Sequence, residues 1–149
     1  MWNQLDGLTG LLSQKSYLNR TLNLQPEDKM LIVLDLDNFK YINDTYGHQA
    51  GDQCLKVIAE CLKKAYSRYG NCYRIGGDEF CVLFRKPEKE KYCREKFYWI
   101  IEKQKKSLHM LPGASYGGAL IEEQESISDT KARADANMYA NKKARKQAR

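Results

Sequence analysis

The sequence lacks the features that mark membrane-embedded, fibrous and secreted proteins. It has only 3 prolines among 149 residues, which excludes collagen-like and proline-rich chains. The most apolar run, Met30 to Leu34, meets a charge at Asp35 and is too short to cross a bilayer. No charged-then-apolar leader opens the chain. We therefore expect a soluble domain without membrane contact, in the cytoplasm or as the cytoplasmic part of a longer, membrane-attached protein.

Metal-binding patterns of cysteine and histidine are also missing. The chain has 2 histidines and 5 cysteines, and no two cysteines have CxxC spacing. A zinc site of the Cys/His type therefore has no support. We interpret the cysteines as small buried residues of a protein in a reducing compartment.

Composition points to one globular domain spanning residues 1–149. Hydrophobic residues make up 42% and charged residues 30%, as in ordinary folded domains. Lys and Arg outnumber Asp and Glu by 25 to 19, which gives a net charge of +6. This charge suits nucleic acid, anionic lipid or a phosphorylated small molecule. No nucleic-acid motif or spaced stacking aromatics accompany it, so we do not expect a nucleic-acid partner.

Hydrophobic periodicity predicts helices alternating with short strands. The expected helices cover residues 13–24, 52–66, 88–107 and 128–146, the last capped by Ser128 or Asp129, and the expected strands cover 29–36, 71–75, 79–85 and 114–121. Residues 39–51 read as polar and turn-rich. A hairpin inside an alternating pattern favours an α+β, ferredoxin-like fold with a mixed sheet and helices on its faces.

Four acidic residues stand at the ends of predicted strands. Asp35 and Asp37 lie at the end of the most apolar strand, and Asp78 and Glu79 lie at the tip of the hairpin. Bringing these acids together creates repulsion that a hard divalent cation, Mg²⁺ or Mn²⁺, would relieve. Each segment alone is better explained as solvent-facing acids beside an ordinary turn. The two segments together favour a cation site.

Three ordered motifs resemble the GGDEF family, the diguanylate cyclases. The motifs are Arg74-Ile75-Gly76-Gly77-Asp78-Glu79-Phe80, the upstream run from Asp35 to Lys40 with Asn43-Asp44, Gly47-His48 and Gly51-Asp52, and the opening Asp6-Gly7-Leu8-Thr9-Gly10-Leu11. The resemblance implies a fold similar to nucleotidyl-cyclase and polymerase palm domains. It also implies condensation of two GTP molecules to cyclic di-GMP and two pyrophosphates, across a homodimer in which each copy holds one GTP.

The resemblance further implies a set of metal and catalytic groups. The ligands of Mg²⁺ (or Mn²⁺) would be Asp35, the backbone carbonyl of Leu36, Asp78 and Glu79. In two-metal chemistry the ions lower the pKa of the attacking hydroxyl and neutralise the triphosphate. Gly76 and Gly77 would let the triphosphate and ribose approach the backbone.

Guanine recognition is implied for four residues in the upstream motif. Asn43 and Asp52 match the family's base-reading residues, and Phe39 and Leu55 would form apolar walls. A carboxylate suits the N1–H and N2–H donors of guanine but would face a lone pair of adenine, a mismatch of about 1–3 kcal/mol. Asp52 therefore favours GTP over ATP. Outside the motif, Asn43 and Asp52 read as ordinary turn and cap residues.

Basic residues matching the family's phosphate ligands are Lys40 and Lys142. Lys146 stands where the family commonly has arginine, and a lysine cannot form a bidentate fork. The remaining charges of the last helix fit a solvated basic face: Lys131, Arg133, Lys143, Arg145 and Arg149.

Two departures from the family pattern lead to further expectations. Ser67 and Gly70 stand where the RxxD product-inhibition motif would be, so we predict no feedback inhibition there. The altered C-terminal motif keeps open an alternative, a catalytically silent GTP-binding or dimerisation module. Family members usually carry an upstream sensor or dimerisation domain, and the first motif begins at Asp6. We therefore expect this chain to be a fragment of a longer sensor protein.

Overall fold

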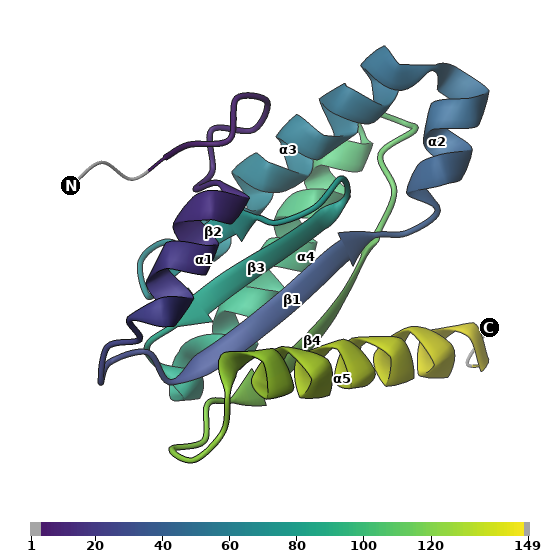
Figure 1. Ribbon diagram of the computed structural model, residues 1–149. Helices are drawn as coiled ribbons and strands as arrows, with labels where there is room; N and C mark the ends of the chain where they lie inside the picture. The colour runs from purple at the N-terminus through teal and green to yellow at the C-terminus, as the bar shows by residue number, and fades with distance from the viewer. Residues whose placement is uncertain (1–3, 148–149) are drawn as a thin grey trace.

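The chain folds as a four-stranded sheet covered by helices (Figure 1). A computed structural model describes residues 4–147, with side chains described as far as Arg145. The elements are α1 (Gln14–Leu22), β1 (Met30–Leu36), α2 (Phe39–Tyr46), α3 (His48–Tyr66), β2 (Gly70–Arg74), β3 (Glu79–Phe84), a 3₁₀ turn (Pro87–Lys89), α4 (Glu90–Lys105), β4 (Ala114–Leu120) and α5 (Ile127–Gln147).

The strand order is β2-β3-β1-β4, and each of the three pairings is antiparallel. This arrangement confirms the expected α+β, ferredoxin-like fold. The expectation of a mixed sheet is wrong in one respect, because no two parallel strands are neighbours among the described residues. Each helical crossover skips one position in the sheet: β3 lies between β1 and β2, and β1 lies between β3 and β4.

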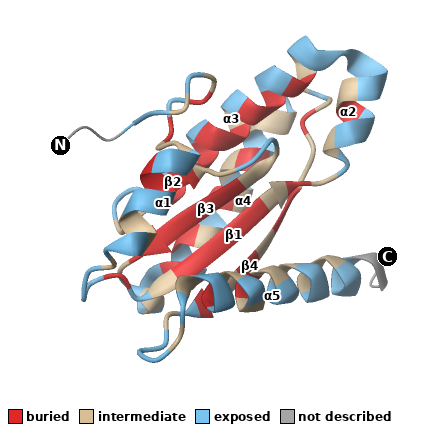
Figure 2. Cartoon of the chain, viewed as in Figure 1, coloured by how far each residue is buried: buried red, intermediate tan, exposed pale blue. Residues whose placement is uncertain are grey.

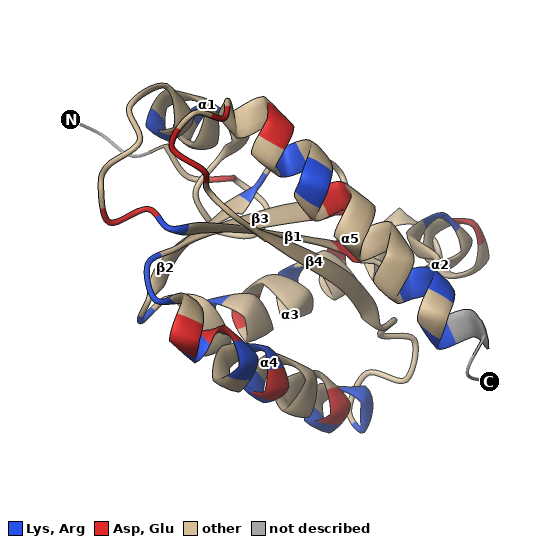
Figure 3. Ribbon diagram, turned by 90° about the horizontal axis from the view of Figure 1, so that it is seen from below, with Lys and Arg blue, Asp and Glu red and all other residues tan. Residues whose placement is uncertain are grey.

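Side chains of β1 alternate between two hydrophobic layers. Ile32 and Leu34 pack toward α3 and α4, whereas Leu31 and Val33 pack toward α1 and α5. Figure 3 shows the two helix pairs on opposite faces of the sheet, and Figure 2 shows the central strands buried between them. Burial on both faces explains why this strand is a continuous apolar run. Among residues 4–147, no helix is long and apolar enough to cross a membrane.

The helices differ from the sequence prediction mainly between residues 39 and 52 and at the start of α5. The segment expected to be turn-rich contains α2, which buries Ile42 and packs Phe39 against the core while most of its other residues face outward. Gly47, with φ of 92°, separates α2 from α3, which therefore begins at His48 rather than Asp52. Helix α5 begins at Ile127, and the Ser126 hydroxyl, rather than Ser128 or Asp129, accepts from a first-turn amide.

All five cysteines are buried and none forms a disulfide. Burial raises the pKa of Cys61 to about 11. These thiols therefore behave as apolar core residues, as the sequence predicted.

Gly117 of β4 lies where the backbone of α5 crosses the sheet. A methyl group at Gly117 would overlap the Ala134 carbonyl oxygen and the Met138 amide nitrogen. Because both are backbone atoms, neither can rotate away. The absence of a side chain at Gly117 thus sets how closely α5 approaches β4.

We predict that Gly117→Ala lowers the free energy of unfolding by about 1–3 kcal/mol, the usual cost of overpacking. Urea unfolding followed by circular dichroism measures this. Gly7→Ala is the matched control, since a methyl group there meets no atom within 4 Å. Equal stability of the Gly117→Ala variant and the control would contradict the close approach.

Candidate active site

The antiparallel register of β1 and β3 brings the predicted acidic residues to one end of the sheet. Asp35 is directly opposite Glu79 in this pairing. The Leu36 amide donates to the Asp78 carbonyl oxygen at 3.3 Å, so the hairpin tip lies beside the end of β1. The two acidic segments are neighbours, as the sequence indicated.

Asp35 is half-buried in an environment unfavourable to its charge. Its Oδ1 atom is buried and has no hydrogen-bond partner among the described residues. Burial raises the pKa of Asp35 to about 6; Lys142 opposes this rise, while Asp78, Asp37 and Glu79 add to it. A bound cation would supply the missing partner for the oxygen and offset the repulsion.

The donor set at this place fits a hard divalent cation. It comprises carboxylates and the Leu36 carbonyl, the oxygen ligands that Mg²⁺ and Mn²⁺ prefer. Among the described residues, no three acidic, His or Cys side chains already form a metal cage. A backbone oxygen and groups from the bound ligand are therefore needed to complete coordination, which is typical of Mg²⁺ sites that hold phosphates.

Arg74 braces the glycine turn of the hairpin. Its guanidinium donates to the carbonyl oxygens of Gly76 at 3.2 Å and Gly77 at 2.9 Å, and pairs with Asp6 at 3.2 Å. Burial alone would raise the pKa of Asp6, but hydrogen bonds from Thr9 and Arg74 outweigh it and hold the pKa below its usual value. The opening motif thus anchors the hairpin, a link between residues 68 positions apart that sequence reasoning missed.

A group of side chains lies close together where α2 meets α3. A methyl group at Gly51 would overlap the Asn43 carboxamide and touch the Phe39 ring, so these three residues are in close proximity. Asp52 follows Gly51 and is exposed. Leu55, predicted as a wall for the base, is buried with 2% of its surface exposed, on the face of α3 that packs on the sheet. Its role toward the base remains a prediction.

The turn between β1 and α2 requires an unusual backbone conformation. The backbone of Asn38 is in the left-handed conformation, with φ of 55°. Among the described residues, Asn38 is the only one other than glycine with a positive φ. Its conformation starts α2 directly after the acidic end of β1. Lys40 in the first turn of α2 is exposed. The first turn of α2, which carries Lys40, therefore follows the acidic end of β1 closely in the chain.

Helix α5 brings basic side chains to the same end of the sheet. Lys142 lies close enough to Asp35 to lower its pKa. It also lines a cavity of about 440 Å³ together with Asn38 and Arg145. Basic side chains thus border both the carboxylates and a cavity large enough for part of a nucleotide.

Three residues of the basic face expected on α5 form ion pairs. Lys131 pairs with Glu79 at 2.8 Å, Arg133 pairs with Glu125, and Arg145 pairs with Asp37 at 3.2 Å. The two arginines stay largely exposed, so the expectation of a solvated side chain is wrong only for Lys131 among these three. These pairs form because α5 lies against the sheet edge and its acidic end (Figure 3). Lys131 and Lys142 are 11 residues apart, about three turns, and so share one face of the helix.

Two further sequence expectations concern positions at the margins. The Lys146 side chain lies outside the described residues. Ser67 is the C-cap of α3, and Gly70 begins β2 with no room for a side chain, because a Cβ there would come 2.8 Å from the Leu83 carbonyl oxygen. The absence of feedback inhibition remains a prediction.

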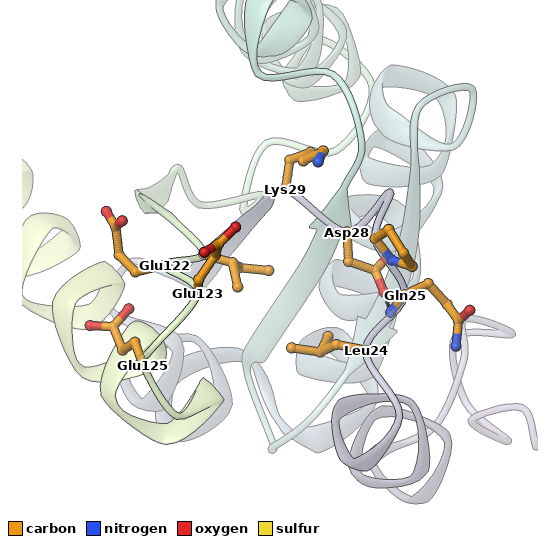
Figure 4. A pocket seen from close by; sticks show the side chains of 9 residues that line it. Leu24, Gln25, Asp28, Lys29, Glu122, Glu123 and Glu125 are labelled. Carbon is orange, nitrogen blue, oxygen red and sulfur yellow. Dashed lines mark hydrogen bonds between the residues drawn. The ribbon is translucent and has the colours of Figure 1, made fainter.

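A second cavity, of about 460 Å³, lies at the opposite end of the sheet between the α1–β1 and β4–α5 loops (Figure 4). It is rich in acidic residues, but Asp28 is paired with Arg20 and Glu125 with Arg133. This cavity has no part in the group of residues around Asp35.

Comparisons with known proteins identify the family. A family model described as "Diguanylate cyclase, GGDEF domain" matches residues 3–148, and the chain belongs to this family. It is 36% identical to diguanylate cyclase DgcZ of Escherichia coli over 96 residues, 62% of this chain and 32% of that protein. It is 29% identical to probable diguanylate cyclase DgcJ of the same organism, over 94% of this chain and 29% of that protein.

Solved structures agree with this assignment. The GGDEF domain of DgcB from Caulobacter crescentus, solved in complex with c-di-GMP, has a TM-score of 0.81 and 29% identity, covering 97% of this chain and 92% of that one. Diguanylate cyclase SiaD of Pseudomonas aeruginosa, solved with its activator SiaC, has a TM-score of 0.80 and 28% identity, covering 94% and 58%. The chain spans about a third of the length of the curated relatives.

We predict that Asp35→Asn stabilises the metal-free protein. The folded pKa of Asp35 is about 6 against an ordinary value of 3.8, so ionisation removes stability from the wild type as pH rises from about 4 to 6. The amide never ionises. The variant should be more stable by about 1 kcal/mol at pH 7.5, a figure reduced for solvent screening, with the difference vanishing below pH 4.

Urea unfolding in EDTA across this pH range measures the effect. Glu123→Gln, which removes an exposed carboxylate at the other end of the sheet, is the control and should change little. If Asp35→Asn proved less stable than the wild type at pH 7.5, the charge of Asp35 would be well satisfied in the metal-free fold.

Proposed function

We propose that this chain is a diguanylate cyclase domain in which each copy binds one GTP and two copies face each other as a homodimer. In each half-reaction the 3′-oxygen of one GTP forms a bond to the α-phosphorus of the other. The bond from that phosphorus to the bridging oxygen breaks, pyrophosphate leaves, and the hydroxyl proton passes to solvent or a nearby base. Two such steps yield cyclic di-GMP and two pyrophosphates.

Residues of this chain would bind and orient the nucleotide. Asn43 and Asp52 read the guanine edge, and Phe39 packs on the base. Lys40 and Lys142 neutralise the triphosphate, while Gly76 and Gly77 leave space for it. Asp35, Asp78, Glu79 and the Leu36 carbonyl would hold Mg²⁺ or Mn²⁺, which when bound lowers the pKa of the attacking hydroxyl and screens the phosphate charge.

One observation carries this proposal: a buried, unpartnered carboxylate oxygen of Asp35 stands opposite Glu79, with Lys142 close by. An unpaired buried charge costs free energy. Binding of a cation together with a polyphosphate at this site would offset that cost. Names of relatives support the same chemistry. Because the chain spans only part of those relatives, an upstream sensor or dimerisation domain belongs to the same proposal.

Incubation with GTP and Mg²⁺ at high protein concentration tests the activity. We predict pyrophosphate and a cyclic dinucleotide, both detectable by chromatography and mass spectrometry. Glu79→Gln should reduce turnover at least about 100-fold, a typical effect of losing one charge-stabilising group, with the fold intact by circular dichroism. Glu123→Gln removes a carboxylate of the same type remote from the site and should retain full turnover.

Retained turnover in the Glu79→Gln variant would refute the role of Glu79. GTP binding by the wild type without any product would refute the cyclase and favour the alternative, a silent GTP-binding or dimerisation module.

We predict that Asp52→Asn weakens GTP binding about 10-fold. The amide NH₂ replaces one of the two carboxylate oxygens that accept hydrogen bonds from guanine, so one N–H donor of guanine is left without an acceptor. Titration with GTP and with inosine triphosphate, which lacks the 2-amino group, measures this. The wild type should prefer GTP about 10-fold, and the variant should lose most of that preference. Equal preference in both proteins would place guanine recognition elsewhere.

A further inference from the structure

The outer edge of β4 is covered by side chains rather than by another strand. As the last strand of the sheet, β4 has one strand neighbour, so alternate carbonyl oxygens point away from the sheet. Helix α5 donates to this edge through four residues spaced by four, which we name the edge ladder. The bonds are Arg133 to Leu120 O (2.6 Å), Asn137 to Gly118 O (2.8 Å), Asn141 to Tyr116 O (2.9 Å) and Arg145 to Ser115 Oγ (2.6 Å).

Element geometry explains the spacing. Four residues advance an α-helix by about 6.0 Å, and two residues advance a strand by about 6.6–6.8 Å. The two repeats nearly coincide, so a helix antiparallel to a strand can bond every second carbonyl with every fourth side chain. The last outward carbonyl, that of Ala114, accepts from the Tyr98 hydroxyl at 2.6 Å, which completes the coverage of the edge.

Side-chain length follows the same geometry. Four residues turn a helix by about 400°, so successive rungs rotate by about 40° relative to the strand. The two central rungs face the edge directly, and short asparagines reach it. The two outer rungs are turned away, and long arginines are needed there. The placement of two asparagines between two arginines is therefore what a straight helix beside a strand requires.

We propose that the edge ladder fixes the axial and rotational position of α5, and that Asn141 thereby acts as a positioning residue for the adjacent phosphate-binding Lys142. This inference rests on the proposed function in one respect, the role of Lys142 toward GTP. Two observations support it. First, the Asn141 side chain bonds the turn of α5 that carries Lys142 to strand β4. Second, Arg145, three residues after Lys142, binds Ser115 and Asp37, and Asp37 directly follows the end of β1. Gly117 gives the helix its close approach but cannot set its rotation.

A double-mutant cycle between Asn141→Leu and Lys142→Ala tests the proposal. Leucine keeps the size of asparagine and removes its donor. Using a fluorescent GTP analogue with Mg²⁺, we expect Asn141→Leu to weaken binding about 3- to 10-fold when Lys142 is present and less than about 2-fold in the Lys142→Ala background. Asn141→Gln, which keeps an amide donor, should recover most of the loss. Ala140→Leu introduces the same side chain at an exposed neighbouring position and should bind as the wild type does.

A second readout is independent of nucleotide. Hydrogen exchange of the backbone amides in residues 138–147 should be faster in Asn141→Leu than in Ala140→Leu. If Asn141→Leu fails to fold, Asn137→Leu removes the neighbouring rung and enters the same cycle.

The outcomes separate the two proposals. Equal loss of binding in both backgrounds, or no loss at all, overturns the positioning role while wild-type binding of GTP leaves the proposed function standing. Absence of GTP binding by the wild type overturns the proposed function and the role of Lys142 with it. Unchanged exchange in Asn141→Leu overturns the claim that the ladder fixes α5.

Discussion

Repulsion between carboxylates held together by strand pairing is the constraint on which the site depends. The register of β1 and β3 places Asp35 directly opposite Glu79, and Asp78 precedes Glu79 in the chain. Hydrophobic side chains of β1 are buried on both faces of the sheet. They fix that register, because a one-residue slip would move each of them to the opposite face and into the wrong hydrophobic layer. Stability of the core is thus what maintains an electrostatically unfavourable cluster at its end.

Each neighbouring element either relieves this cluster or keeps it in place. Lys131 from α5 pairs with Glu79, and Lys142 opposes the charge of Asp35. Arg74 and Asp6 hold the glycine turn that carries Asp78. Arg145 and Ser115 donate hydrogen bonds to the Asp37 carboxylate. Asp35, in contrast, keeps a buried oxygen without a partner among the described residues. The surroundings therefore leave a specific demand for positive charge rather than a general excess of acid.

Local patterns predicted the elements with strong periodicity and the hairpin with its glycine turn. The same patterns indicated that Asp35, Asp78 and Glu79 would meet, because each stands at a strand end. Helix α2 was not predictable, since Phe39 and Ile42 are too few to show a helical period on its buried face. The pairs Asp6–Arg74 and Lys131–Glu79 were not predictable either, because each joins segments far apart in the chain through packing. The near-complete burial of Leu55 was not predictable either, because it depends on how α3 packs on the sheet.

The most direct test of the account is a measurement of Mn²⁺ binding to the isolated chain in the presence of a GTP analogue, by electron paramagnetic resonance. The account predicts a bound ion whose affinity falls at least about 10-fold in both Asp35→Asn and Glu79→Gln, as loss of a charged ligand implies, and is unchanged in Glu123→Gln. Equal affinity in the wild type and in the first two variants would contradict it, since the paired carboxylates would then have no part in holding the ion.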